Sequence, residues 1–531
     1  MTPTAANPIV ATASGRVEGL SQEGVLSFLG IPYAGSCSGE NRFLPPRPPE
    51  PWTGVRTAHA AGPTAPQLER PRHGSHEQSE DCLALNVWTP GTTGKKPVLF
   101  WMHGGGFFTG RGLTAHTDGA ELARTEDVVV VSVNHRLALL GFLYLSELGG
   151  GDWGYEANPS LLDLVAALEW VRDNIAGFGG DPSNVTIFGH SGGGGKVSAI
   201  LTSPLAEGLF SRAVVHGGPP FGYKDPARAT EIAQRALALL GVNGNDASAL
   251  RALPRERLMA VQAQLGVGAE PTDHGMLFAP VAGTASLPAF PEEALAAGVA
   301  AGIPLMTGTA IDEARFIMAG QPRWQEPDFD LDEATVLRIL DAGFNHPDDA
   351  RAVLDAYRDS GGPYRGSSGD SARLRLLDLM LDILSDQFAI RTHRLAAAKA
   401  AFGTAPVYSY WCTLGQDMPL GSFHGTEMPI FFRNVGMGAI PVDEPAYHKA
   451  APVMSHALAT FARTGNPNDG GVGGLVWPAF EQGEPAQFHF GDDGFDVTDR
   501  FARERLERWS GFVTTSRQDP WGRAIGESGR A

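Results

Sequence analysis

The stretch from Asn184 to Ile200, NVTIFGHSGGGGKVSAI, decides the fold of this chain. A short apolar run ends in Gly-His-Ser-Gly-Gly, and small apolar residues follow, a pattern typical of a strand, a tight turn and a helix packed on a sheet. In a G-x-S-x-G turn the serine is strained, and the residues two positions before and after it must lack a Cβ. Gly189 and Gly193 meet this requirement around Ser191. Such a turn would hold the Ser191 hydroxyl above the sheet edge and aim the N–H of Gly192 at a developing oxyanion.

The five-residue pattern alone also fits an ordinary glycine-rich turn. The predicted strand before it and the helix after it favour the reactive turn, because the motif needs that context. The run from Gly192 to Gly195 points the same way, since glycine inside a helix costs about 0.5 to 1 kcal/mol relative to alanine. A backbone that must approach another group closely would explain such a run.

The composition is that of a globular protein, with 43% hydrophobic and 19% charged residues among 531. The formal net charge of −18 argues against nucleic acid or an anionic membrane surface as a partner. No apolar stretch reaches the roughly 18 to 20 residues of a membrane span, and the N-terminus lacks the features of a signal peptide, so we expect a cytoplasmic or already processed protein.

The chain has three cysteines, Cys37, Cys82 and Cys412. They have no metal-ligand spacing, which favours free thiols over a disulfide or a metal site.

Buried strands alternate with helical patterns through the first half of the chain. Pro97 to Met102 and Val128 to Val133 are continuous apolar runs, as expected of strands covered on both faces. Asn158 and Pro159 resemble the cap and first turn of a helix whose apolar residues recur at helical spacing. Repetition of strand, helix and strand predicts an α/β fold with a mostly parallel sheet and helices on both faces.

We predict a single domain, 1–531, with its core from about residue 9 to 512. Alanine-rich helical segments at about 225–300 and 328–401 are candidate cap insertions, and the tail 517–531 is expected to be loose. Further strands are predicted at Ile9 to Leu20 and Val25 to Tyr33, as an edge hairpin, and at Ala84 to Trp88, Ala213 to His216, Ile303 to Thr307, Val407 to Trp411 and Gln487 to Phe490.

A serine becomes an effective nucleophile only with a base, an orienting carboxylate and donors for the oxyanion. The sequence His-Gly-Gly-Gly from His103 to Gly106 follows a buried strand directly, which is typical of an oxyanion loop. An ordinary glycine-rich turn after a strand is the alternative interpretation. We predict that the N–H groups of Gly105 and Gly106 join that of Gly192 in a three-donor oxyanion hole.

Hydrolases with this turn place the serine, the acid and the histidine in that chain order. Among 15 histidines, His424 follows a late predicted strand across a loop and is the predicted base. The acid is predicted to be Glu313, in GTAIDEA after the strand at Ile303, with Asp312 and then Asp417 as alternatives. Two further late histidines lie in a helical pattern and are expected to be surface or packed residues, His448 and His456.

Together with further stretches, these residues resemble the type-B carboxylesterase family, which is related to the cholinesterases, over roughly residues 9–512. The resemblance implies an α/β-hydrolase fold, hydrolysis of carboxylic esters through an acyl-serine, no cofactor, and a glutamate as the third triad member, which favours Glu313 over Asp312. The further stretches are FLGIPY from Phe28, SEDCL from Ser79, NVW from Asn86, VSVN from Val131 with Arg136-Leu137, and FGGDP from Phe178 with Asn184-Val185.

Four positions depart from the family pattern. His190 and Gly192 stand where the family usually has glutamate and alanine. His190 is either a tolerated replacement or an imidazole that titrates near pH 6.5 beside the site. His-Gly-Gly-Pro-Pro from His216 lacks a serine-rich segment, so a supporting hydroxyl is expected to be missing. Cys82 has no cysteine between Trp52 and Glu80 to pair with, in keeping with a reducing compartment.

The predicted function is hydrolysis of small to medium carboxylic esters, and the predicted binding partner is a small-molecule ester. The oligomeric state, monomer or dimer, is not predicted. The same triad could act on amides, carbamates or a specialised ester, and some relatives are non-catalytic binding proteins. Phe107 and Phe108 either border the acyl pocket or belong to the core. Three more distant aromatic residues are candidates for a cap lining: Phe316, Trp324 and Phe344.

Overall fold

The structure is a computed structural model of the chain. It describes residues 7–68, 76–148, 156–218, 222–243, 246–266, 276–319, 323, 326, 329–344, 347–359, 375–438, 442–481, 486–499 and 503. The predicted loose tail, 517–531, and Trp324 lie outside these residues, as does the side chain of Phe344.

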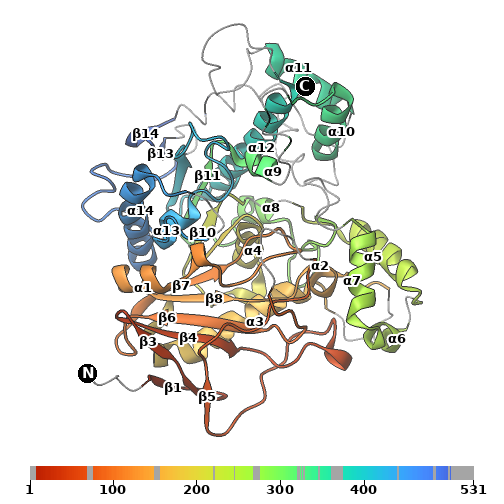
Figure 1. The fold of residues 1–531 in the computed structure, drawn as a ribbon, viewed down its shortest axis with the longest axis vertical. Coiled ribbons are helices and arrows are strands. Elements are labelled where there is room, and N and C mark those ends of the chain that lie inside the picture. Colours follow the sequence, from red (N-terminus) through yellow and green to blue (C-terminus); the bar gives the residue numbers. More distant parts are fainter. Residues whose placement is uncertain are drawn as a thin grey trace.

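A sheet of eleven strands runs through the described residues, in the order β14-β13-β12-β11-β10-β9-β7-β8-β6-β4-β3 (Figure 1). Neighbouring strands from β8 to β13 are parallel, and the remaining pairs at the two ends are antiparallel. The mostly parallel sheet is therefore confirmed. Its strands are β3 (Leu20–Gln22), β4 (Val25–Pro32), β6 (Ala84–Thr89), β7 (Lys96–Met102), β8 (Val129–Val133), β9 (Gly180–His190), β10 (Arg212–His216), β11 (Leu305–Ala310), β12 (Val407–Cys412), β13 (Gln487–Gly491) and β14 (Gly494–Thr498).

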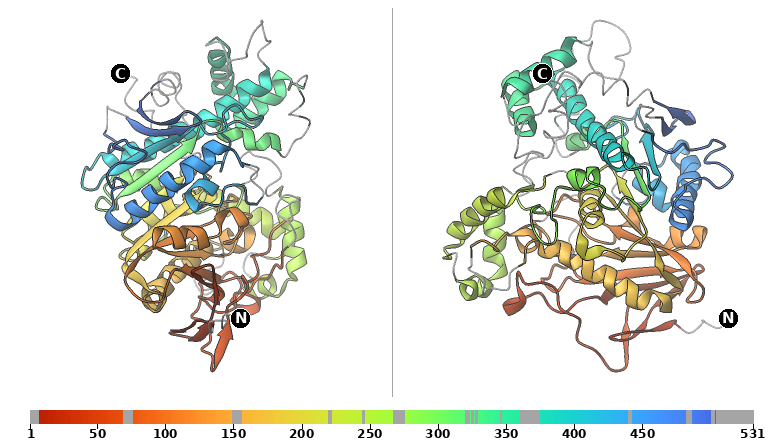
Figure 2. Two further views of the ribbon diagram at one scale, coloured as in Figure 1. Left: turned by 60° about the vertical axis from the view of Figure 1, so that its left-hand side comes forward. Right: turned by 180° about the vertical axis from the view of Figure 1, so that it is seen from behind.

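Both faces of the sheet are covered, which explains why its central strands are apolar without alternation. Successive side chains of a strand point to opposite faces, so Phe100 of β7 lies in one core and Leu99 and Trp101 in another. Figure 1 is drawn from the side of the second core, and the rear view in Figure 2 shows the helices over the first. The first core is covered by α3 (Pro159–Asn174), α4 (Gly192–Leu201) and the second half of α12 (Leu376–Ala400), and the second by α1 (Ala120–Glu126), α13 (Met428–Phe432) and α14 (Pro445–Thr464).

The N-terminal segment differs from the prediction of one strand from Ile9 to Leu20. It forms three strands, of which β1 (Ile9–Thr12) and β2 (Gly15–Glu18) pair in a small sheet with β5 (Val55–Thr57). Gly15 opens β2 with a φ of +153°, and a Cβ there would lie 2.4 Å from the Trp52 indole. The chain turns at Ala13 and Ser14, directly before this glycine, and the predicted edge hairpin is formed by β3 and β4 alone.

Helical segments occupy two separate corners of the molecule in Figure 1. The helices α10 and α11 pack with the first half of α12 around a small apolar cluster that includes Leu340, Val353 and Leu381. Among the described residues, no helix combines the length and the apolar character that crossing a membrane requires. The remaining helices and those of the corners are α2 (Ala138–Phe142), α5 (Pro226–Leu240), α6 (Ala247–Ala252), α7 (Arg255–Gln264), α8 (Pro291–Ala296), α9 (Phe316–Ala319), α10 (Glu333–Phe344) and α11 (Pro347–Asp359).

Candidate active site

Ser191 lies at the junction of β9 and α4, where the predicted strand, turn and helix are present. Its φ of 60° and ψ of −127° are unusual for a residue with a side chain, and such conformations cluster at functional sites. A Cβ added at Gly193 would lie 2.1 Å from the carbonyl oxygen of Met102, and one at Gly189 would lie 2.6 Å from the Gly193 carbonyl. The turn is thus as tight as the glycine pattern predicts.

The glycine loop after β7 lies directly against this turn. A Cβ added at Gly104 would lie 3.4 Å from the Cβ of Ser191, and one at Gly192 would lie 1.9 Å from the carbonyl oxygen of Gly106. Gly105 and Gly106 have φ angles of 97° and 63°. Within the described residues, neither of their N–H groups donates a hydrogen bond, and the first N–H groups of a helix such as that of Gly192 have no intrahelical acceptor. Three unpartnered donors are therefore available near Ser191.

Glu313 and His424 form a hydrogen-bonded pair between the loops that follow β11 and β12. Nδ1 of His424 donates to Oε2 of Glu313. The other carboxylate oxygen, Oε1, accepts from the Thr309 hydroxyl at 2.6 Å and from the Ala310 N–H at 3.0 Å. Because Nδ1 carries the proton in this arrangement, Nε2 of His424 is left as an acceptor for a hydroxyl proton.

The two alternative acids have other surroundings. The Asp312 N–H donates to the Ser422 carbonyl oxygen at 3.0 Å, and Oδ2 of Asp312 accepts from the Ser422 N–H at 3.0 Å. It forms an ion pair with Arg315 at 3.4 Å and so supports the two loops, and among the described residues it makes no hydrogen bond or ion pair with His424. Asp417 is exposed on the surface. Two later histidines are exposed on α14, where they pair with acidic residues, His448 with Asp443 and His456 with Glu126.

The imidazole of His424 reaches the serine turn. Its ring centre lies 4.3 Å from that of His190, the residue immediately before Ser191. Phe316 and Phe388 pack against the same imidazole at 4.9 and 5.4 Å. The Ser191 hydroxyl forms no hydrogen bond to any described residue, and hydrogen bonds in unliganded catalytic sites often tighten only when a substrate binds. The three segments that carry the serine, the acid and the histidine thus meet at one end of the sheet.

His190 is buried and does not titrate near its ordinary value. Burial lowers its pKa well below 6.5, and the nearby imidazoles of His424 and His216 lower the pKa further. This direction argues against an additional ionisation of His190 near pH 6.5. A Cβ added at Gly217 would lie 3.0 Å from Nε2 of His190 and 2.9 Å from Oε1 of Glu313. The imidazole of His190 and the carboxylate of Glu313 therefore leave little room for a side chain at residue 217.

Glu427 was not predicted from the sequence, although it follows His424 by three residues. It is fully buried, and burial together with the nearby Glu313 raises its pKa to about 8. The Tyr410 hydroxyl lies 3.5 Å from its Oε1 and 2.7 Å from Nδ1 of His216. If Glu427 is protonated, it adds no second negative charge beside Glu313. The Glu313 carboxylate is then the main negative charge next to His424.

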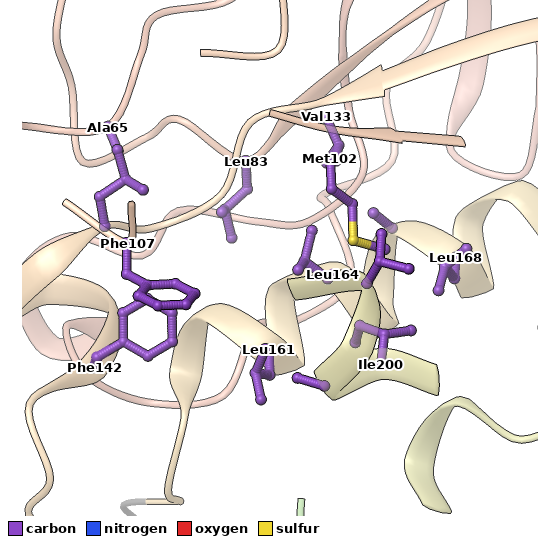
Figure 3. Packing of buried hydrophobic residues seen from close by; sticks show 14 of the residues in the cluster. Ala65, Leu83, Met102, Phe107, Val133, Phe142, Leu161, Leu164, Leu168 and Ile200 are labelled. Carbon is purple, nitrogen blue, oxygen red and sulfur yellow. The ribbon is translucent and has the colours of Figure 1, made fainter. Parts of the chain in front are cut away.

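Phe107 belongs to the core. Its side chain is fully buried and packs against the ring of Phe142, with ring centres 5.6 Å apart (Figure 3). The ring centre of Tyr223 lies 6.1 Å away. Of the two alternatives predicted for Phe107, the core position is therefore correct and the acyl-pocket position is wrong. Phe108 is partly buried, and a Cβ at Gly106 would lie 2.6 Å from its ring, so this ring covers the glycine loop.

The fold and this end of the sheet define an α/β-hydrolase. The chain belongs to the carboxylesterase family, because the model of the Carboxylesterase family matches residues 6–509. It is therefore a carboxylic ester hydrolase, as the resemblance in the sequence predicted.

Similar proteins cover almost the whole chain. The para-nitrobenzyl esterase of Bacillus subtilis (strain 168) is 35% identical over 89% of this chain and 93% of its own length. The phenmedipham hydrolase of Pseudarthrobacter oxydans is 34% identical over 93% of this chain and 97% of its own. The crystal structure of a Geobacillus stearothermophilus carboxylesterase at pH 6.2 superimposes with a TM-score of 0.81, at 36% identity, over 94% of this chain and 99% of that one.

Proposed function

We propose that this protein hydrolyses small to medium carboxylic esters through an acyl-serine intermediate. Ser191 is the nucleophile, His424 the general base and Glu313 the carboxylate that orients it. The observation that carries the proposal is the hydrogen bond from Nδ1 of His424 to the buried Glu313. The same imidazole lies beside the strained serine, because its ring centre is 4.3 Å from that of His190, the residue before Ser191.

The reaction follows from this arrangement. Nε2 of His424 takes the proton of the Ser191 hydroxyl while the oxygen attacks the ester carbonyl carbon. The carbonyl oxygen becomes an oxyanion that accepts hydrogen bonds from the N–H groups of Gly105, Gly106 and Gly192, each worth about 2.7 to 4 kcal/mol in the transition state. The bond to the alcohol then breaks, and His424 returns the proton to the leaving oxygen. Water repeats the sequence on the acyl-serine and releases the acid.

The proposed size of the acyl group rests on the rings around the histidine. Phe316 and Phe388 both pack on the imidazole of His424, so apolar surface adjoins the reacting atoms on one side. Such rings favour apolar acyl or alcohol groups. A family relative carries the name para-nitrobenzyl esterase, which agrees with a small aromatic ester as a substrate.

The experiment measures hydrolysis of p-nitrophenyl esters from acetate to palmitate, together with an anilide and a carbamate. We expect the rate to be highest for short and medium chains and to be lost in Ser191→Ala. Ser198→Ala is the matched control, because the Ser198 hydroxyl bonds the Gly194 carbonyl of its own helix at 3.0 Å. An organophosphonate should leave one adduct, on Ser191. Full activity in Ser191→Ala would refute the proposed nucleophile, and a rate that rises steadily to palmitate would refute the proposed acyl size.

A further inference from the structure

Lys196 is a fully buried lysine on α4, one turn beyond Gly192. Its Nζ donates to the carbonyl oxygen of His103 at 2.9 Å and lies 3.0 Å from Nε2 of His135. Within the described part of the chain it makes no ion pair. Buried lysines usually neutralise their charge on a carboxylate, so a lysine with only neutral partners requires another explanation.

The hydrogen bonds around His135 define which group donates. Nδ1 of His135 lies 2.9 Å from the Arg136 carbonyl oxygen and 2.9 Å from the Ser160 hydroxyl. The carbonyl can only accept and the hydroxyl can also accept, so a proton on Nδ1 satisfies both contacts. Nε2 is then an acceptor, and Lys196 donates to it. Burial lowers the pKa of both His135 and His103 well below the ordinary value, so both rings stay neutral.

The two acceptors suit a neutral amine. An ammonium group has three N–H donors, and a neutral amine has two, which match the His103 carbonyl and Nε2 of His135. Burial lowers the pKa of Lys196 to about 7. The arrangement therefore leaves no buried donor without an acceptor once the amine is neutral.

The position of this amine connects the two sources of oxyanion donors. His103 begins the loop that carries Gly105 and Gly106, and its ring stacks on that of His135 with centres 4.6 Å apart. Lys196 belongs to the helix that begins with Gly192. One hydrogen bond from Nζ to the His103 carbonyl thus joins the loop to the helix.

We propose that Lys196 is a positioning residue that holds the oxyanion loop against the nucleophile helix through the His103 carbonyl, with His135 orienting its amine. The inference rests on the proposed function, since it assigns a support to the donors named there. Displacement of a catalytic group by about 1 Å can cost on the order of 100-fold in rate, so a loop anchored in this way affects the transition state more than substrate binding.

The test compares Lys196→Met with the parent. Methionine keeps the apolar stem and removes the donors, so we expect kcat to fall about 10- to 100-fold while KM changes by less than about threefold. The affinity for a trifluoromethyl ketone, whose hemiketal oxygen occupies the oxyanion hole, should fall by a similar factor. Lys196→Gln retains a neutral N–H donor and should recover part of the loss.

The matched control is Lys399→Met. Lys399 is also a buried lysine that donates to a backbone carbonyl, that of Ala301 at 2.8 Å, but it lies on α12 and outside the site. This variant should keep the kcat of the parent. A folded Lys196→Met with kcat within twofold of the parent would overturn the proposal, as would equal losses in both methionine variants.

A structure of the parent bound to the trifluoromethyl ketone decides the case if Lys196→Met does not fold. Nζ within hydrogen-bond distance of the His103 carbonyl supports the proposal, and an amine turned away from the loop overturns it. Failure of the proposed function is distinguishable, because the parent itself would then neither hydrolyse esters nor react with the ketone at Ser191.

Discussion

The two halves of the active site are held together by different means. Around Ser191, backbone packs on backbone, and a single added carbon at Gly192 or Gly193 would lie about 2 Å from a carbonyl oxygen. Around His424, buried side chains with ionisable groups hold one another through hydrogen bonds, beginning with Glu313.

This difference separates the changes that each half can accept. At Gly192 and Gly193 the serine half has no room for an added atom, but it contains little charge that a substitution could remove. The histidine half can accept a side chain of the same shape, but a change of charge alters the protonation of its neighbours. A substitution that adds an atom should therefore impair mainly the serine half. A substitution that keeps the shape but changes the charge should impair mainly the histidine half.

The largest effect is expected for Glu313→Gln, which keeps the shape and removes the charge. The amide no longer holds the Nδ1 proton of His424 and can stabilise the wrong tautomer, so kcat should fall about 1,000- to 10,000-fold. Steady-state hydrolysis of p-nitrophenyl butyrate measures it. Asp312→Asn is the control, because Asp312 bonds Ser422 and pairs with Arg315, and it should keep kcat within about tenfold. Equal losses in the two variants would contradict the assignment of Glu313.

A smaller loss is expected for Gly192→Ala, the steric change in the serine half. The Cβ would lie 1.9 Å from the Gly106 carbonyl oxygen, so the oxyanion loop must move, and we expect kcat to fall about 100-fold. Gly195→Ala in the same helix is the control, because its Cβ would meet only the edge of the Phe107 ring, at 3.1 Å. Comparable kcat values for both alanine variants would show that the loop accommodates the carbon and would remove the contrast between the halves.

The sequence predicts the serine half better than the histidine half, and the reason is physical. Strain at Ser191 imposes a local requirement, glycine two positions before and after, which stands in the sequence itself. The environment of His190 is different, because its low pKa depends on burial and on imidazoles from other segments. Its titration therefore could not be judged from the residues beside it.

Contacts between distant segments are likewise hidden in the sequence. The hydrogen bond from Lys196 to His103 joins residues 93 positions apart, and no spacing rule indicates it. Phe107 illustrates the same limit, since the letter alone fits both a pocket and a core. The apolar strands and their order of strand, helix and strand depend on local periodicity, and for that reason most of the sheet was predicted correctly.

The smallest of the expected effects concerns stability and tests the histidine half alone. Burial, together with Glu313, raises the pKa of Glu427 from 4.5 to about 8. Between these values the folded protein keeps the proton and the unfolded chain releases it. The free energy of unfolding of the parent should therefore fall as the pH rises from 5 to 8, by about 1.4 kcal/mol per pH unit relative to Glu427→Gln.

Urea unfolding of the parent and Glu427→Gln at pH 5, 6, 7 and 8 measures this difference. Glu444→Gln, at an exposed position before α14, is the matched control and should follow the parent at every pH. A difference between the parent and Glu427→Gln that stays constant with pH would mean that Glu427 is ionised in the folded protein. Two adjacent buried carboxylates would then both be charged, and the histidine half would tolerate charge in the same way as an exposed surface does. If the difference changes with pH as expected, charge is what limits substitution in this half, just as space limits it around Ser191.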